Sequence, residues 1–167
     1  MAVPTIAGDG VLLRRTTSAD FSFLLSFFSN PAVYDIWDGH PMAAADIRVR
    51  YLGGRSPEVE CFIVQHEGRD IGFVQYHKAD DGAGGGMDLS LLPEARGGRL
   101  GTAVVRTLAE FVQSELGWDR FTVDPDLSNV RGVNFWKKVG FVPTRLVKDD
   151  PGREPYLLLE WPFARAG

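Results

Sequence analysis

The order of apolar and polar residues predicts a strand and two helices in the first third of the chain. The segment VLLRRTT at 11–17 favours a first strand. Apolar residues then recur at helical spacing between 21 and 28, which predicts a helix with Ser18 as its N-cap. That helix should end before Pro31, because the residue before a proline resists helical geometry. A further helix is expected at 42–52, followed by two glycines.

The middle of the chain has the alternation that is typical of strands. Two β-rich runs at 59–67 and 70–79 are separated by Gly-Arg and predict an antiparallel hairpin. The glycine-rich stretch at 81–86 should be a flexible loop. A third strand is expected at 87–92, with Met87, Leu89 and Leu91 on one face. Asp88 and Ser90 would then point to the other face.

The last third predicts two more helices and three more strands. The first helix carries a buried stripe made of Val104, Val105, Leu108, Val112 and Leu116. A strand at 120–124 and a helix from Ser128 to Gly140 should follow. Two final strands flank the turn Asp-Asp-Pro-Gly. Residues Met87–Asp124 should form a right-handed crossover between parallel strands.

These elements predict an α/β (α+β) fold of a single domain over residues 1–167. A single mixed, mostly antiparallel, twisted sheet of about seven strands would be flanked by helices. The length of 167 residues and an apolar content of 44% are ordinary for one globular domain.

Charge and cysteine usage narrow the function classes. The net charge of −4 argues against nucleic acid and mildly favours a cationic partner. The single cysteine, Cys61, excludes an internal disulfide and fits a reducing compartment, so a cytoplasmic location is expected. No apolar stretch is long enough for a membrane span, and the N-terminus lacks a signal-peptide pattern. The three histidines are not at metal-ligand spacing, so no metal is expected.

The segment Pro93–Leu108, PEARGGRLGTAVVRTL, combines a glycine-bearing loop with the start of a helix. Glycines permit close backbone approach, and the amides of a first helical turn attract anions. The segment is neither a Walker loop nor a clean dinucleotide fingerprint. On its own it is consistent with a phosphate site or with a purely structural turn.

Two motifs in the right order resemble the GCN5-related N-acetyltransferases. ARGGRLGTAVV is similar to their acetyl-CoA pyrophosphate loop, Arg/Gln-x-x-Gly-x-Gly/Ala, with Arg99 where a glycine is usual. SNVRGVNFWKKVGF is similar to their later helix and strand, with Gly132 for the usual alanine and Trp136 for the usual tyrosine. The resemblance implies acetyl-CoA as cosubstrate. The residues that it implies around acetyl-CoA are Leu91, Leu92, Arg96, Gly97, Gly98, Arg99, Leu100, Gly101, Thr102, Asn129 and Trp136.

Three further segments resemble the aminoglycoside 6'-N-acetyltransferases within that family. They are DIWDGH, GMDLSLL and VDPDLSNVR. The resemblance implies that Asp88 binds the attacking amine and takes its proton, directly or through water. The residues implied to bind the acceptor are Asp35, Trp37, Asp38, Asp88, Asp124 and Asp126. A core position for Trp37 and a helix-entry role for Asp124 are the structural alternatives.

The function expected is transfer of an acetyl group from acetyl-CoA to the 6'-amino group of an aminoglycoside, a small cationic amine. The acceptor could instead be a siderophore lysine or another small amine. A CoA-binding module without turnover is the non-enzymatic alternative, because the indole of Trp136 cannot supply the proton that a tyrosine would. The protein is expected to act as a monomer or homodimer without nucleic acid or membrane.

Overall fold

The computed structural model describes residues 5–163. Its strands are β1 (Ile6–Gly8), β2 (Val11–Arg15), β3 (Val59–His66), β4 (Arg69–Lys78), β5 (Gly84–Leu91), β6 (Arg120–Val123), β7 (Val142–Val147) and β8 (Tyr156–Glu160). Its α-helices are α1 (Phe21–Phe27), α2 (Pro31–Trp37), α3 (Ala44–Arg50), α4 (Leu100–Ser114) and α5 (Val130–Val139), and short 3-10 turns lie at Ser18–Asp20 and Pro93–Ala95.

Within the described residues the strands form an eight-stranded sheet in the order β1-β2-β3-β4-β5-β6-β8-β7. The pairs β1–β2, β2–β3, β3–β4, β6–β8 and β7–β8 are antiparallel, whereas β5 and β6 are parallel. The predicted mixed, mostly antiparallel sheet is therefore confirmed. The strand that the sequence did not reveal is β1, whose three residues are too few to show an alternation.

The described chain groups into two compact units. The first contains the residues through His77 together with Asp88–Leu108, and the second contains Lys78–Met87 and the residues from Ala109 onward. Strand β5 contributes to both. The single domain expected over residues 1–167 stays a prediction.

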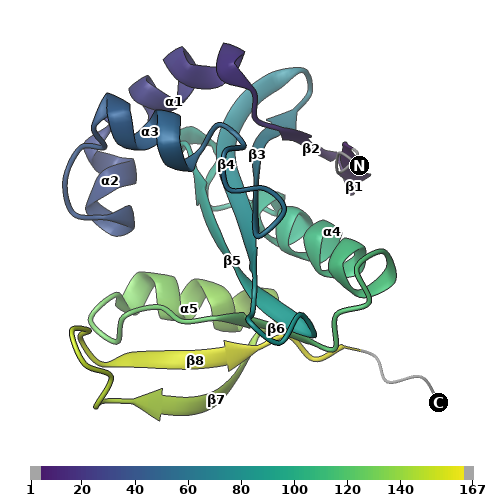
Figure 1. Cartoon of the computed structure of the whole chain (residues 1–167), viewed down its shortest axis with the longest axis vertical. Helices are drawn as coiled ribbons and strands as arrows, with labels where there is room; N and C mark the ends of the chain where they lie inside the picture. Colours follow the sequence, from purple (N-terminus) through teal and green to yellow (C-terminus); the bar gives the residue numbers. More distant parts are fainter. Residues whose placement is uncertain (1–4, 164–167) are drawn as a thin grey trace. The chain divides into compact units, whose positions relative to one another are not determined.

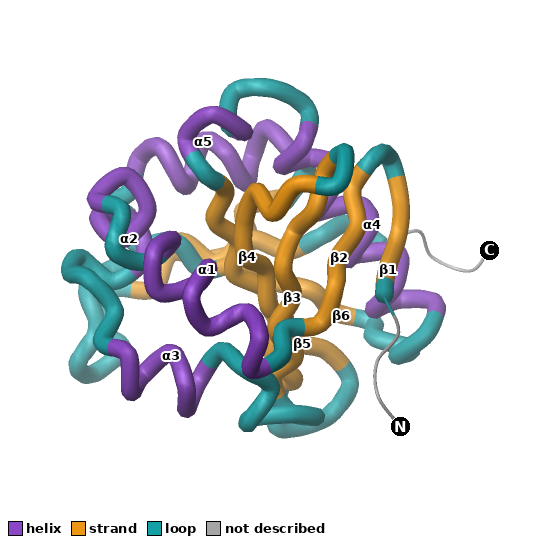
Figure 2. Tube along the Cα trace, turned by 90° about the horizontal axis from the view of Figure 1, so that it is seen from above, coloured by secondary structure: helices purple, strands orange, loops and turns teal. Residues whose placement is uncertain are grey.

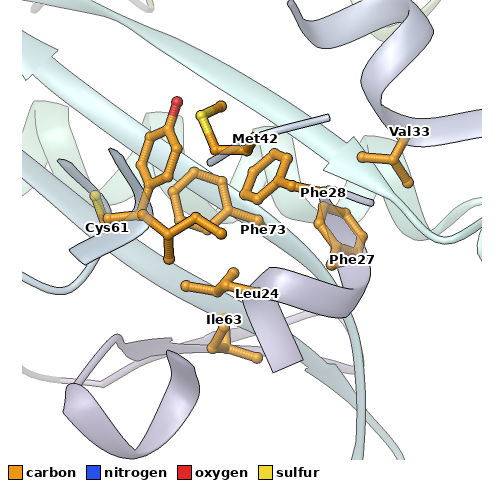
Figure 3. Close-up of a cluster of buried hydrophobic side chains, with 10 residues drawn as sticks. Leu24, Phe27, Phe28, Val33, Met42, Cys61, Ile63 and Phe73 are labelled. Carbon is orange, nitrogen blue, oxygen red and sulfur yellow. The ribbon is translucent and has the colours of Figure 1, made fainter. Parts of the chain in front are cut away.

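In the first unit, α1 and α3 cover one face of β3 and β4 (Figure 2). The core between them is aromatic at its centre. The ring of Phe28 lies 5.2 Å from Tyr51 and 5.5 Å from Phe73, measured between centroids. Leu24, Ile63 and Met42 are among the other members of this cluster (Figure 3).

The first helical segment begins one residue earlier than the sequence predicted. The N-cap is Thr17 and not Ser18, because the Thr17 hydroxyl accepts from Ala19 N and the Asp20 carboxylate accepts from Thr17 N. Pro31 does separate two helices, but it also opens the second one. The Asn30 side chain caps α2 by accepting from Ala32 N, and a proline is well tolerated at the first helical position.

Strand β5 differs from the expected pattern in two ways. Residues 84–86, expected in a loop, are already strand, and a Cβ at Gly84 would lie 2.5 Å from Arg120 O on β6. Glycine thus lets β6 approach. Burial along β5 does not follow the expected apolar face, because residues 84–87 and Ser90 are buried while Leu89 is half-buried. Both faces of this strand are therefore covered, and the assignment of Met87, Leu89 and Leu91 to one face stays a prediction.

In the second unit, α5 lies along the antiparallel hairpin of β7 and β8 (Figure 1). The N-cap of α5 is Asn129 and not Ser128, since Asn129 Oδ1 accepts from Gly132 N at 3.0 Å. Gly140 ends the helix as predicted, with a φ of 124° that favours glycine. Pro143 fits β7 because this strand is at the edge of the sheet.

Candidate functional site

The Asp88 carboxylate lies in the first unit, on the half of β5 that precedes the glycine-bearing loop. Its side chain is 41% exposed. Asp88 Oδ2 accepts a hydrogen bond of 2.9 Å from Gln75 Nε2 on β4, and it lies 3.9 Å from His77 Nε2. The carboxylate is therefore fixed on one side and open to solvent on the other.

Gln75 is buried and is itself held in one orientation. Its Oε1 accepts from Arg55 Nη2 at 3.1 Å, and the Cys61 thiol lies 3.6 Å from the same oxygen. Arg55 Nε in turn donates to Arg50 O at 3.0 Å. These contacts leave the amide nitrogen of Gln75 for Asp88.

Trp37 belongs to the aromatic core of the first unit. Its ring packs against Phe28, Tyr51 and Phe73, with centroids 5.3–6.3 Å apart. Its indole N–H donates to the Tyr51 hydroxyl at 3.1 Å, and the residue remains half-buried. Burial raises the pKa of Tyr51, and the nearby Asp88 charge contributes in the same direction. Trp37 is thus a partly buried core tryptophan, and its contact with an acceptor stays a prediction.

Asp35 and Asp38 lie at the end of α2 and are exposed. Asp38 Oδ2 is 3.4 Å from His40 Nε2, between two exposed side chains. The structure brings neither carboxylate into the Gln75–Asp88 hydrogen-bond network. Their proposed contact with an acceptor rests on the resemblance alone.

The Arg96 side chain donates hydrogen bonds to two backbone carbonyls of the chain itself. Its Nε donates to Leu91 O and its Nη2 donates to Ala32 O, both at 2.8 Å. Leu92 N donates to Ile71 O at 2.8 Å. These bonds fasten the loop to the end of β5 and to α2. Arg96 therefore shapes the loop, and the carbonyl of Leu91 is already engaged.

The loop after Arg96 has the features of an anion cradle. Gly97 has a φ of +83°, and a Cβ added at Gly97 or Gly98 would meet no described heavy atom within 4 Å. The fifteen-residue helix α4 starts at Leu100, so its first-turn amides and its dipole follow the loop directly. The open backbone of Gly97 and Gly98 fits a diphosphate, which needs close approach of peptide N–H groups.

Arg99 stands where the family pattern has glycine. Its guanidinium is directed to the turn between β1 and β2, where Nη2 would be 3.8 Å from a Cβ at Gly10. Arg99 O accepts from Ala103 N at 2.9 Å and so begins the hydrogen bonding of α4. Backbone and side chain therefore have separate tasks at this position.

Within the second unit, the two predicted acceptor carboxylates share one arginine. Asp124 Oδ2 accepts from Arg153 Nη1 at 2.7 Å, and Asp126 Oδ1 lies 3.5 Å from Arg153 Nη2. Asn129 is occupied by its cap, and a Cβ at Gly132 would collide with the Asn129 side chain. The glycine that departs from the family alanine thus makes room for this cap.

Trp136, in the place of the family tyrosine, is buried. Its ring packs against Phe135 and Phe141, with centroids 5.0 Å and 5.3 Å away. The structure places it in the apolar packing of α5, and its predicted contact with the cofactor stays a prediction.

Sequence reasoning missed the residues that hold the carboxylates. Gln75 could have been suspected as a lone polar side chain in the apolar run of β4, whereas nothing in the sequence marked Arg55 or Arg153. Within residues 5–163 no group of three or more His, Cys, Asp or Glu side chains is arranged for a metal. In the same part of the chain no helix combines the length and the apolar character needed to cross a bilayer.

The comparisons with known proteins identify similar proteins over most of the chain. The family model of the Acetyltransferase (GNAT) domain matches residues 11–142. An aminoglycoside N(6')-acetyltransferase type 1 of Klebsiella pneumoniae is 25% identical over 173 aligned positions, which cover 94% of this chain and 86% of the relative. The relative of the same name from Serratia marcescens matches equally.

Solved structures of similar proteins carry the corresponding ligands. AAC(6')-Ib in complex with paromomycin and acetyl-CoA is 26% identical, with a TM-score of 0.80 over 92% of this chain and 93% of that one. AAC(6')-Ib with coenzyme A and kanamycin matches with a TM-score of 0.78 at 26% identity, over 90% of this chain and 93% of that one.

Proposed function

Because the chain belongs to the GNAT acetyltransferase family and is an acetyl-CoA-dependent N-acetyltransferase, we propose that its acceptor is the 6'-amino group of an aminoglycoside. The observation that carries the proposal is the Asp88 carboxylate, half exposed and oriented by the buried Gln75 amide. Relatives named as aminoglycoside 6'-acetyltransferases support the same acceptor at 25% identity.

Asp88 has two tasks in the proposed reaction. Its charge attracts the ammonium group of the acceptor and aligns the nitrogen. The amine must lose a proton to attack the thioester, and Asp88 takes that proton directly or through water. A fixed carboxylate is suited to both tasks, because alignment costs no further ordering of the side chain.

Acetyl-CoA supplies the thioester, whose C–S bond breaks as the new C–N bond forms. On the protein side, the Gly97 and Gly98 backbone and the first turn of α4 would bind the diphosphate. Thr102 and Leu100 belong to that turn, and Gly101 is buried in it. The leaving thiolate receives no proton from Trp136, because an indole N–H is not a usable acid. Solvent would protonate it.

The remaining predicted residues are proposed as acceptor contacts. Trp37 offers an apolar side to a sugar ring. Asp35, Asp38, Asp124 and Asp126 bind further ammonium groups, in keeping with a net charge of −4. The cytoplasmic location expected from the sequence belongs to this proposal, as does a monomeric or homodimeric state.

A thiol-release assay with acetyl-CoA and kanamycin tests the proposal. We expect stoichiometric CoA release and a product whose acetyl group is on the 6'-nitrogen by two-dimensional NMR. A matched aminoglycoside with a hydroxyl in place of the 6'-amine should give no release. Tight binding of acetyl-CoA without release for any aminoglycoside would refute the proposed acceptor.

A further inference from the structure

Arg153, in the turn between β7 and β8, forms ion pairs with Asp124 and Asp126 of the same unit. Arg153 Nη1 donates to Asp124 Oδ2 at 2.7 Å, and Nη2 donates to Asp124 O at 2.6 Å. Asp126 Oδ1 is 3.5 Å from Nη2. The guanidinium lies over the ring of Tyr156, 3.7 Å from its centroid. One side chain therefore contacts two carboxylates and an aromatic face.

The hairpin segment that carries Arg153 is aligned by backbone bonds. Leu127 N donates to Pro155 O at 2.9 Å, and Leu157 N donates to Pro125 O at 3.1 Å. The Tyr156 hydroxyl donates to Asp150 Oδ2 at 3.0 Å. These contacts join the hairpin to residues 124–127 and do not involve the Arg153 side chain. The guanidinium can therefore leave the carboxylates while the backbone stays paired.

The ion pair is open enough to exchange. The side chains of Arg153, Asp124 and Asp126 are 34%, 46% and 50% exposed. Exposed ion pairs contribute little, because water and salt screen them. A ligand with several ammonium groups can thus compete for the same oxygens.

We infer that Arg153 is an internal counter-ion that an incoming polycationic acceptor displaces from Asp124 and Asp126, so that this arginine sets the apparent affinity for the acceptor. The inference rests on the proposed function, because it takes these carboxylates as acceptor-binding groups. Arg153 then lowers affinity for weakly charged amines more than for polycations, which have several charges to exchange. It is a specificity-determining residue and takes no part in acetyl transfer.

Substitution of Arg153 by glutamine tests the inference through the KM for kanamycin. R153Q should lower this KM about three- to tenfold and leave kcat within about twofold, because the competing cation is gone. The control is Arg145→Gln, which removes the same charge from an exposed position on β7. A KM for kanamycin that is unchanged or raised in R153Q, at an unaltered melting temperature, would overturn the inference.

The coupling to Asp124 gives a second measurement. In an Asp124→Asn background, R153Q should no longer improve the KM, since the exchange site has been weakened already. A full improvement in that background would contradict the displacement. If R153Q does not fold, Arg153→Lys replaces the planar fork by a point charge and should lower the KM about twofold. An Arg153→Lys protein with an unchanged KM would also overturn it.

Failure of this inference is distinguishable from failure of the proposed function. Calorimetric binding of kanamycin or spermidine needs no turnover. Tighter binding of both by R153Q, without acetylation of kanamycin by the natural chain, would reject the aminoglycoside acceptor and retain the exchange. Acetylation of kanamycin by the natural chain and by R153Q with the same KM would support the aminoglycoside acceptor and reject the displacement of Arg153.

Discussion

The Gln75 side-chain amide donates to the Asp88 carboxylate across 2.9 Å between β4 and β5, and its carbonyl oxygen is held by Arg55. This arrangement fixes the direction of the one carboxylate to which the resemblance assigns the attacking amine. Gln75 is thus a positioning residue that acts through Asp88. The neighbouring strands β4 and β5 bring Gln75 within hydrogen-bonding distance of Asp88. Because Arg55 donates to the amide oxygen of Gln75, the amide nitrogen is the end that faces the carboxylate.

Replacing Gln75 by leucine should therefore slow turnover. We expect kcat to fall about tenfold, equivalent to about 1.4 kcal/mol and close to the value of one hydrogen bond to a charged group. The KM for acetyl-CoA should stay within about twofold of the natural value. Steady-state kinetics with both substrates varied measures the two quantities. Asp88→Asn should lose at least as much turnover, because it removes the carboxylate itself.

Gln65 provides the matched control for the Gln75 variant. On β3 its amide nitrogen donates to Asp70 Oδ1 at 2.7 Å, an equivalent contact between an amide and a carboxylate. Gln65→Leu should leave kcat unchanged. Equal losses in the two variants, or a normal kcat in Gln75→Leu at normal melting temperature, would remove Gln75 from the mechanism.

A second prediction separates the backbone of the glycine-bearing loop from the Arg99 side chain. The Arg99 guanidinium is directed to the turn at Gly10, so Arg99→Gly should leave acetyl-CoA affinity equal or slightly better. Gly97→Ala should weaken it several-fold, because a side chain at a φ of +83° strains the loop by about 1 kcal/mol. Isothermal titration of acetyl-CoA compares the two. A clear loss of affinity in Arg99→Gly would mean that the guanidinium grips the cofactor.

The sequence predicted the elements well because each was long and strongly patterned. The hairpin of β3 and β4 is confirmed almost residue for residue. In α4 the buried stripe of Val104, Val105, Leu108 and Val112 is confirmed, but the predicted Leu116 lies beyond the end of the helix at Ser114 and is only half-buried. The errors fall where a single hydrogen bond or a close approach of a distant strand decides the local structure. Thr17 is the N-cap instead of Ser18 because the Asp20 carboxylate accepts a hydrogen bond from Thr17 N in return. Residues 84–86 join β5 because β6 approaches the backbone at Gly84 too closely for a side chain.

The candidate site was predictable only in part. Asp88 and the glycine-bearing loop lie close together in the sequence, and two separate resemblances predicted them, through GMDLSLL and ARGGRLGTAVV. The partners Gln75 and Arg153 come from distant segments, and their contacts depend on strand register and on the path of a hairpin turn. Neither can be inferred from spacing along the chain, since no local pattern encodes which polar side chains meet across a sheet.

A third prediction concerns stability and pH at Asp20. Burial alone would raise the pKa of Asp20, but hydrogen bonds from Arg14 and Thr17 outweigh it and hold the pKa below its usual value. A depressed carboxyl pKa stabilises the fold above the unfolded pKa of about 3.9, and this stabilisation is lost as the pH falls through the folded value. Asp20→Asn should cost about 1–3 kcal/mol at pH 7, from the lost ion pair and weakened cap.

Urea unfolding at several pH values checks the Asp20 prediction. The difference between the natural chain and Asp20→Asn should be full at pH 6–7 and should shrink as the pH falls below the unfolded value of about 3.9 and through the lower folded value. Asp46→Asn, on the exposed first turn of α3, is the control and should change stability little. A difference that stays constant from pH 7 to pH 3 would show that the charge of Asp20 does not cause it.

The last prediction is that the Cys61 thiol is inert in the folded protein. Burial raises the pKa of Cys61 to about 11, and Arg55 offsets this only in part. At pH 8 only about one thiol in a thousand is then ionised, and the thiolate is the reactive form. Dithiobis(nitrobenzoate) should therefore label the folded chain at least about 100-fold more slowly than a free thiol. In guanidinium chloride the same reagent should label the single cysteine at once.

Rapid labelling of the native chain would contradict the buried position of Cys61. Slow labelling would mean that thiol released in the kanamycin assay comes from CoA and not from the protein.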